Sequence, residues 1–427
     1  MNLLIIGSGP AGIFAAETIR RRDHGSSITM VTADHNLSHS PVMLSYWMAG
    51  SHPKEILFFR DPSWSERMAV HVRPGSQATS LNTSSKKLLL ADGQEISYDR
   101  LLIATGSVPI SLPIPGMESK GVTRLRTLFD AERILEEVDH VKEVVIIGGG
   151  FIGLKLACHL KEKSLGVTVF EKEPKLAARM YDLKASRLIE EKLREKGIRV
   201  ETNVEVAEIL NERGRVSGVL MKDGRIFSCQ RVIEAVGVRP NTEFLIGSGI
   251  DLDGGVLVNG HMETNVPGVY AAGDVTMTID SITSERVNNA TWPAATRQGT
   301  VAGWNMAGGN RTYIHNFTMN ALNLFGFRVM VAGHAYLQEC PEMDISQEEG
   351  EGCYRKIVVK SGRVIGFILI GDISGAGFLL NLMKQRREIS FSSRDLLSRS
   401  LSLQRYLPPN LGYCHSIHFD RRNRKFS

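Results

Sequence analysis

A glycine fingerprint that occurs twice constrains the fold of this chain more than any other feature. In its first copy, four apolar residues (3–6) precede Gly7, Gly9 and Gly12, and a helical pattern follows over 13–22. In such a strand–turn–helix unit the first glycine permits the tight turn, the second lets a pyrophosphate approach the backbone, and the third lets helix and strand pack closely. The phosphate then lies on unpaired N–H groups at the positive end of the helix dipole.

The second copy begins near residue 144. Apolar residues 144–147 precede Gly148, Gly150 and Gly153, and another helical run follows over 154–163. Two complete units predict two bound dinucleotides and two doubly wound α/β domains. A chain of 427 residues is also too long for one typical core, so two or three domains are expected.

The residue that ends the second strand of each unit distinguishes the two nucleotides, because a Rossmann unit usually places an acid there to bind ribose hydroxyls. In the first unit this place holds Thr32, and Asp34 follows two residues later. Asp34 is either the substitute for that acid or an ordinary turn residue. In the second unit, strand 167–170 ends in Glu171. A carboxylate here binds the 2′-hydroxyl of NAD and repels the 2′-phosphate of NADP.

A second internal repeat helps to divide the chain, since residues 235–240 parallel residues 104–109. The expected parts are a discontinuous first nucleotide domain (1–110 and 241–310), a second nucleotide domain (111–240), a C-terminal domain (311–400) and a basic tail (401–427). Patterning further predicts hairpins at 87–96 and 215–232, helices at 182–196, 292–306 and 378–384, and strands at 329–332, 356–360 and 363–370.

Composition excludes several classes of function. A net charge of +5 gives no case for nucleic-acid binding. Five scattered cysteines without a C-x-x-C pair argue against a metal or iron–sulfur site within this chain and against a disulfide framework, and they favour reduced thiols in a cytoplasm. No apolar run approaches ~18 residues, so no membrane span is expected.

The two fingerprints, residues 104–106 and the segment 271–274, in this order, resemble the FAD/NAD(P)-dependent pyridine nucleotide–disulphide oxidoreductases over roughly residues 1–400. The resemblance implies FAD on the first fingerprint, with Asp274 reaching its ribityl and phosphate groups. It also implies NAD(P)H on the second fingerprint, with nicotinamide against one flavin face, and a C-terminal α+β domain used for subunit contact. A buried carboxylate such as Asp274 needs hydrogen-bond donors, and ribityl hydroxyls provide them.

The stretch 37–50 decides the branch within this family. Members that reduce disulfides or peroxides carry one or two redox cysteines here, and in the single-cysteine branch the cysteine falls where this chain has Val42. Valine forms neither a sulfenate nor a mixed disulfide, so that chemistry is not expected. With residues 292–308 and 360–366, the stretch is similar to rubredoxin reductases and to the flavin domain of NADH-dependent nitrite reductases, in which flavin passes electrons singly to an iron–sulfur or rubredoxin-type partner.

Two positions at the expected flavin edge depart from the family pattern. Lys155 stands where many members have a glutamate near flavin N5, and Tyr46 stands where some relatives have a lysine that pairs with that glutamate. A lysine beside N5 stabilises an anionic reduced flavin by charge attraction. Alternatively, Lys155 is a solvated helix residue.

The predicted contacts divide between the two cofactors. Those for FAD are Gly7, Gly9, Pro10, Ala11, Gly12, Asp34, Pro41, Ala104, Thr105, Gly106, Arg126, Gly273, Asp274 and Pro293. Those for NAD(H) are Gly148, Gly150, Phe151, Ile152, Gly153, Glu171 and Gly237. No metal-ligand set is predicted.

The expected function is that of an FAD-dependent NADH oxidoreductase moving electrons between NAD(H) and an iron–sulfur or rubredoxin-type protein. Hydride transfer between nicotinamide and flavin depends on geometry more than on an acid–base residue. Two alternatives stay open: an NAD-coupling flavin subunit of a larger metal or iron–sulfur oxidoreductase, of aldehyde or nitrite oxidoreductase type, and a flavin-binding regulatory protein with low turnover. The basic groups 384–387 and 421–425 are either solvated ends or a docking site for an acidic redox partner.

Overall fold

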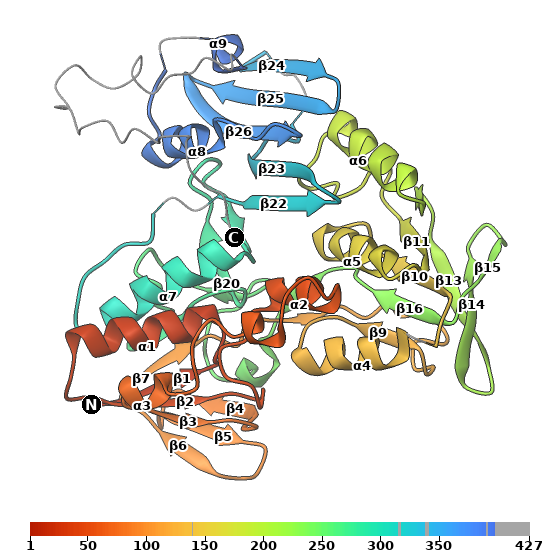
Figure 1. Cartoon of the computed structure of the whole chain (residues 1–427). Coiled ribbons are helices and arrows are strands. Elements are labelled where there is room, and N and C mark those ends of the chain that lie inside the picture. Colours follow the sequence, from red (N-terminus) through yellow and green to blue (C-terminus); the bar gives the residue numbers. More distant parts are fainter. Residues whose placement is uncertain (139, 315–316, 338–340, 390–391, 398–427) are drawn as a thin grey trace, which may run out of the picture.

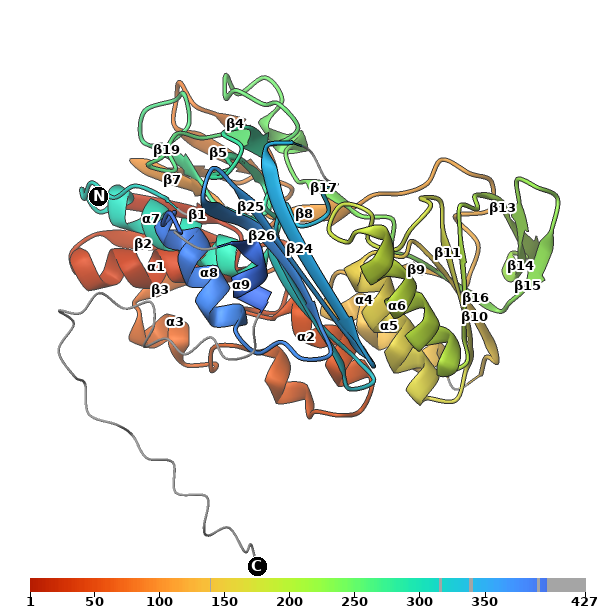
Figure 2. The same ribbon diagram turned by 90° about the horizontal axis from the view of Figure 1, so that it is seen from above.

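The computed structural model describes residues 1–138, 140–314, 317–337, 341–389 and 392–397. Three five-stranded sheets form the framework of these ranges, two of them wholly parallel and one antiparallel (Figure 1). Seen from above, the two parallel sheets lie on opposite sides of the molecule (Figure 2), and the antiparallel sheet lies above them in the view of Figure 1. The predicted tail 401–427 lies outside the described residues, as do Cys340 and Cys414.

The first parallel sheet carries the first glycine turn. Its strands, in spatial order, are β19 (Val269–Ala271), β7 (Arg100–Ile103), β1 (Asn2–Ile6), β2 (Ser27–Val31) and β3 (Val70–Arg73). Helices α1 (Pro10–Arg22) and α7 (Trp292–Met306) lie side by side on this sheet (Figure 1). A Cβ built on Gly299 would lie 2.1 Å from the carbonyl oxygen of Ala11. The small residues of α7 therefore let the two helices meet at their backbones.

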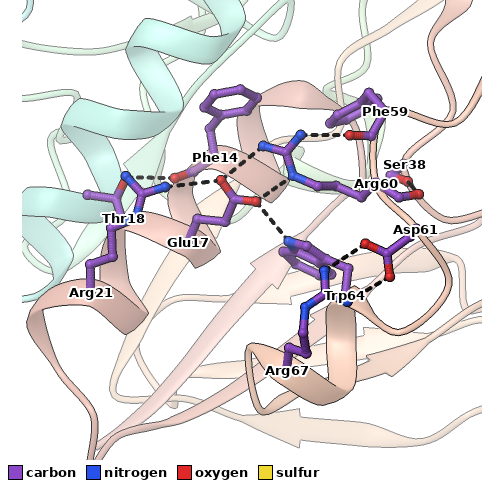
Figure 3. A network of polar contacts seen from close by, with 10 residues as sticks. All are labelled: Phe14, Glu17, Thr18, Arg21, Ser38, Phe59, Arg60, Asp61, Trp64 and Arg67. Carbon is purple, nitrogen blue, oxygen red and sulfur yellow. Dashed lines mark hydrogen bonds and ion pairs between the residues drawn. The ribbon is translucent and has the colours of Figure 1, made fainter.

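A buried carboxylate on α1 fastens the segment that follows α2 (Pro41–Met48) to this unit (Figure 3). The Oε1 atom of Glu17 accepts hydrogen bonds from Arg60 Nε at 2.5 Å and from Trp64 Nε1 at 2.8 Å. Burial alone would raise the pKa of Glu17, but these bonds hold it below its ordinary value. Phe59, which precedes Arg60 in the chain, packs edge-on against Trp292 at the start of α7, with ring centroids 4.8 Å apart.

The second parallel sheet repeats this plan around the second glycine turn. Its strands, in spatial order, are β12 (Ile198–Thr202), β11 (Gly166–Glu171), β10 (Glu143–Ile147), β16 (Arg231–Glu234) and β9 (Val122–Arg124). The helices of this part are α4 (Leu128–Val138), α5 (Phe151–Glu162) and α6 (Leu183–Glu195).

The prediction of one hairpin over 215–232 is wrong at its far end. Strands β14 (Arg215–Met221) and β15 (Ile226–Ser228) do form a hairpin, beside β13 (Val206–Glu212). Residues from Arg231 onward instead leave the hairpin and pair in parallel with β10. All four residues of β16 are buried, which is typical of a strand inside a parallel sheet.

The antiparallel C-terminal sheet contacts the second nucleotide unit. Its strands are β22 (Met319–Leu324), β23 (Phe327–Gly333), β26 (Arg363–Ile370), β25 (Cys353–Lys360) and β24 (Met343–Gly350). One face carries α8 (Ala376–Gln385) and α9 (Ser393–Leu397), and the other shares a hydrophobic core with α5 and α6. At this contact Asp182, the N-cap of α6, accepts a 2.7 Å hydrogen bond from the Tyr354 hydroxyl and lies 3.1 Å from the Lys356 ammonium.

The two segments of the internal repeat lie together where the chain crosses between the nucleotide units. Strand β8 (Ser107–Pro109) pairs antiparallel with β17 (Val238–Pro240). The remaining short elements are η1 (Lys54–Leu57), α3 (Trp64–Arg67), β4 (Ala78–Asn82), β5 (Lys87–Leu90), β6 (Glu95–Ser97), η2 (Glu243–Leu245), β18 (Val256–Leu257), β20 (Thr276–Ile279) and β21 (Arg286–Val287). Within the described ranges, no helix is both long and apolar enough to cross a bilayer.

Candidate active site

Both glycine turns open into one cavity of about 1680 Å³. Ligand cavities commonly measure about 300–1,000 Å³, so this one has room for more than one ligand. It brings together most of the predicted site residues: Gly7, Gly9, Pro10, Ala11, Asp34, Pro41, Ala104, Thr105, Gly106, Arg126, Gly150, Phe151, Ile152, Lys155, Gly237, Gly273, Asp274 and Pro293. The predicted residues that do not line it are Gly12, Tyr46, Gly148, Gly153 and Glu171.

The three glycines of the first turn have different tasks. Gly7 has a φ of +112°, and a Cβ there would lie 2.1 Å from the carbonyl oxygen of Ala104. A Cβ at Gly12 would lie 2.0 Å from the carbonyl oxygen of Gly7, so this residue allows helix and strand to touch. Around Gly9, the N-cap of α1, no atom lies within 4 Å of such a Cβ, and no side chain caps the helix. The open space and the free N–H groups fit a pyrophosphate.

The second turn has the same geometry. Gly148 has a φ of +111°, and its Cβ would lie 2.4 Å from the carbonyl oxygen of Ala235. A Cβ at Gly153 would lie 2.1 Å from the carbonyl oxygen of Gly148. Gly150, the N-cap of α5, again faces open space and has no side-chain cap. A second pyrophosphate therefore fits here.

Glu171 ends β11 directly beside the second turn. Its Oε2 accepts a 2.7 Å hydrogen bond from the Gly149 N–H, and its Oε1 accepts a 2.9 Å hydrogen bond from the Glu173 N–H. Each oxygen of an ionised carboxylate accepts more than one hydrogen bond. The carboxylate is thus held in place by backbone while keeping capacity for ribose hydroxyls.

At the first turn the polar groups around β2 are arranged differently. The Thr32 hydroxyl, at the usual place of the ribose acid, bonds to the Ser8 hydroxyl at 3.0 Å. Asp34 lies on the cavity wall, where its Oδ2 is 3.0 Å from His39 Nδ1 and its Oδ1 accepts a 2.9 Å bond from the Asn36 N–H. Burial alone would raise the pKa of Asp34, but the His39 and Asn36 hydrogen bonds hold it below its ordinary value.

Asp274 follows β19 at the carboxyl end of the first sheet. Its Oδ2 accepts hydrogen bonds from the Ser107 hydroxyl at 3.0 Å and from Arg126 Nη2 at 3.2 Å. The neighbouring Gly273 N–H donates to the buried side chain of Gln298 on α7 at 2.7 Å. Sequence reasoning missed Ser107 and Gln298, because only the folded chain brings β8 and α7 to this turn.

Lys155 lies on the cavity wall on the first turns of α5. Its Nζ is 5.1 Å from the centroid of the Tyr46 ring, and the His159 ring is 5.3 Å from the same ring. Among the described residues, no carboxylate forms an ion pair with Lys155. Burial lowers the pKa of Lys155, and burial together with the Lys155 charge lowers that of His159 to about 4. Lys155 and Tyr46, each predicted to lie at the flavin edge, are thus in contact with one another, and a neutral histidine lies beside the Tyr46 ring.

Cysteine does not contribute to the cavity wall within the described ranges. Val42 lines the cavity with 44% of its surface exposed. Cys158 and Cys229 are buried elsewhere, and burial raises the pKa of each thiol to about 12. A thiol with such a pKa is protonated near neutrality and is a poor nucleophile.

Two parallel sheets whose glycine turns share one cavity define a flavoprotein oxidoreductase that holds two dinucleotides. Residues 1–299 match the family model described as pyridine nucleotide-disulphide oxidoreductase, and residues 319–387 match that of the rubredoxin NAD+ reductase C-terminal domain. The chain belongs to the pyridine nucleotide-disulphide oxidoreductase family.

Proteins with several different activities are similar to this chain over most of its length. It is 31% identical over 390 residues to the epsilon subunit of NADH-dependent phenylglyoxylate dehydrogenase of Aromatoleum evansii, covering 91% of this chain and 92% of that one. It is 29% identical to the nitrite reductase [NAD(P)H] of Bacillus subtilis over 94% of this chain but only 49% of that enzyme. The ferredoxin reductase for the CYP199A2 system of Rhodopseudomonas palustris is 25% identical, with a TM-score of 0.87 over 95% of this chain and 99% of that one.

These comparisons confirm the predicted family, the α/β fold class with its C-terminal α+β domain, and the enzyme class. The chain is an FAD-dependent NAD(P)H oxidoreductase. The predicted roles of individual site residues and the predicted domain limits stay predictions.

Proposed function

We propose that this protein moves electrons between NADH and an iron–sulfur or rubredoxin-type protein through bound FAD. The observation that carries the proposal is the composition of the cavity wall: both glycine turns face it, and Val42 stands where a redox cysteine would be needed. Without a thiol there, no disulfide or sulfenate relays the electrons. The ferredoxin reductase with a TM-score of 0.87 supports a protein acceptor.

In this proposal each polar group in the cavity or beside it has one task. The free N–H groups at the start of α1 and α5 bind the pyrophosphates of FAD and NADH. Asp274, aimed by Ser107 and Arg126, binds the ribityl side, while Asp34 and Glu171 bind the adenosine riboses of FAD and NADH. Bound FAD supplies the hydride acceptor and the release of electrons one at a time.

Lys155 places a positive charge at the flavin edge. The Tyr46 ring covers its ammonium, and His159, kept neutral by burial, adds no second charge. A cation held in a partly water-excluded wall stabilises negative charge that develops beside it more strongly than one in bulk water. With FAD bound, Lys155 would therefore stabilise negative charge on the part of the flavin that lies beside it.

The free reductase and the flavin subunit of a larger complex are both compatible with this site. The match to a dehydrogenase subunit covers more than 90% of both chains, and this favours the flavin subunit of a larger complex as the second candidate function. We also propose a cytoplasmic location, because the cysteines are few and scattered, and subunit contact through the C-terminal sheet.

Purification from the native host under anaerobic conditions, followed by an assay of NADH-dependent electron transfer, tests the proposal. A free reductase purifies alone and reduces a [2Fe–2S] ferredoxin or a rubredoxin with NADH. A complex subunit purifies with an iron–sulfur or other metalloenzyme subunit, and NADH reduces the metal centres of that complex. Failure of the purified, flavin-loaded protein to reduce any one-electron protein acceptor would contradict both candidates.

A further inference from the structure

His39 lies between the loop after β2 and the start of α2. It lines the cavity, and its side chain is only 13% exposed. One ring nitrogen, Nδ1, is 3.0 Å from Asp34 Oδ2. The other, Nε2, is buried and has no hydrogen-bond partner in the protein part described by the structure. Buried polar atoms rarely stay without a partner, so an unpaired nitrogen on a side chain that lines the cavity points to a ligand group.

Asp34 needs a support that an acid at the end of a strand does not need. The ribose acid of a Rossmann unit ends its strand, whereas Asp34 lies two residues farther on, in a loop. Thr32, at the strand end, already uses its hydroxyl to bond Ser8. The Asn36 N–H holds one carboxylate oxygen of Asp34 and His39 holds the other. Only His39 among these supports comes from the segment that leads into α2.

We propose that His39 is a positioning residue of the adenosine-ribose site of FAD. Its Nδ1–H directs the Asp34 carboxylate toward the ribose, and its Nε2 accepts a hydrogen bond from a hydroxyl of the same cofactor. The inference rests on the proposed function in one respect, since it requires FAD at the first glycine turn.

Two substitutions of His39 distinguish the contributions of its two ring nitrogens. In His39→Asn the amide nitrogen replaces Nδ1 and retains the bond to Asp34, while Nε2 is lost. In His39→Ala both bonds are lost. A neutral hydrogen bond contributes about 0.5–1.5 kcal/mol and one to a charged group about 1.5–3 kcal/mol. The dissociation constant of FAD should therefore rise roughly 2- to 13-fold for His39→Asn. For His39→Ala it should rise by a further factor of about 2 to 13, because the bond to Asp34 also exists without FAD and only part of its free energy enters the binding equilibrium.

The constants are measured with full-length apoprotein by titrating FAD and following the change of flavin fluorescence. FMN serves as the second probe, because it lacks the adenosine ribose. We expect the variants to weaken FAD binding and to leave FMN binding unchanged, whereas a general distortion of the site weakens both. His71→Ala, on an exposed position of β3, is the matched control and should bind FAD like the wild type.

A double-mutant cycle tests whether His39 acts through Asp34. If it does, His39→Ala costs much less affinity in an Asp34→Asn background than in the wild type. The inference is overturned if His39→Ala binds FAD as tightly as the wild type, if His39→Asn is as weak as His39→Ala, or if FMN binding falls equally. Absence of FAD binding by the wild type would instead contradict the proposed function.

Discussion

Exchange of Glu171 tests how the second nucleotide site chooses between NADH and NADPH. Both carboxylate oxygens are tied to backbone, to the Gly149 N–H at 2.7 Å and to the Glu173 N–H at 2.9 Å. The negative charge is therefore fixed beside the glycine turn and cannot swing away from a 2′-phosphate. Glu171→Gln removes the charge but keeps an oxygen that can accept one of these hydrogen bonds.

The size of the effect follows from the charges. A phosphate with a charge of about −2 that lies about 5 Å from a carboxylate is repelled by about 1.7 kcal/mol at the dielectric constant of water, and by more in a partly buried site. This energy corresponds to roughly a 17-fold change in kcat/KM. Glu171→Gln should therefore raise kcat/KM for NADPH at least about 15-fold, while NADH loses the stronger, charged hydrogen bond to its ribose and becomes a poorer substrate.

The assay is the initial rate with ferricyanide as acceptor over a series of NADH and NADPH concentrations. Glu173→Gln is the matched control, because it removes an equal charge from an exposed residue two positions away. Glu171→Arg should move the preference further toward NADPH. The reasoning is refuted if Glu171→Gln leaves the ratio of the two kcat/KM values unchanged, or if Glu173→Gln shifts it equally.

Three further outcomes are expected. Lys155→Met should lower the two-electron potential of the flavin by roughly 20–65 mV, which spectroelectrochemistry measures, because about 1–3 kcal/mol of charge attraction is lost; an unchanged potential would contradict a role at the flavin edge. Arg60→Leu should cost about 1.5–3 kcal/mol of unfolding free energy in urea, because the buried Glu17 loses both hydrogen bonds from Arg60 and keeps Trp64 and Arg21 as partners, and Glu17→Leu with Arg60→Leu should cost less. Since the folded pKa of Glu17 lies below its ordinary 4.5, this stabilisation is present above about pH 4.5 and is lost as the pH falls through the folded pKa. Cys158→Ala should retain NADH–ferricyanide activity, and loss of activity would place a thiol close to the flavin.

Local patterns predicted the elements whose residues carry a complete signal of their own. Both glycine turns, the helix 292–306 and the strand 363–370 needed no information from distant residues. Strand β24 was not predicted, because its sequence is mostly polar and it forms an edge of the sheet by pairing with β25. The far end of the hairpin 215–232 was misplaced because periodicity does not show that β16 pairs with β10.

The residues of the candidate site also divide into those that have a local sequence signal and those that have none. Glycines at fixed spacing and the acid at the end of β11 are local signals, and the predictions of Gly9, Gly150 and Glu171 as cofactor contacts rest on them. The placement of Lys155 and Tyr46 at the flavin edge was expected only through the family resemblance, and their contact with one another was not predicted. His39 carried no signal, because a single histidine in a polar loop has no pattern, and only the fold places it 3.0 Å from Asp34.

An anaerobic titration with NADH tests the central claim most directly. The claim is that bound FAD takes up the electrons of NADH without a thiol relay, since Val42 replaces the redox cysteine and, among the described cysteines, Cys158 and Cys229 are buried. We predict that one NADH per bound FAD bleaches the visible flavin absorbance completely, and that prior alkylation of accessible thiols does not change this ratio. Consumption of a second equivalent before bleaching is complete, or a flavin that NADH leaves oxidised, would contradict the account.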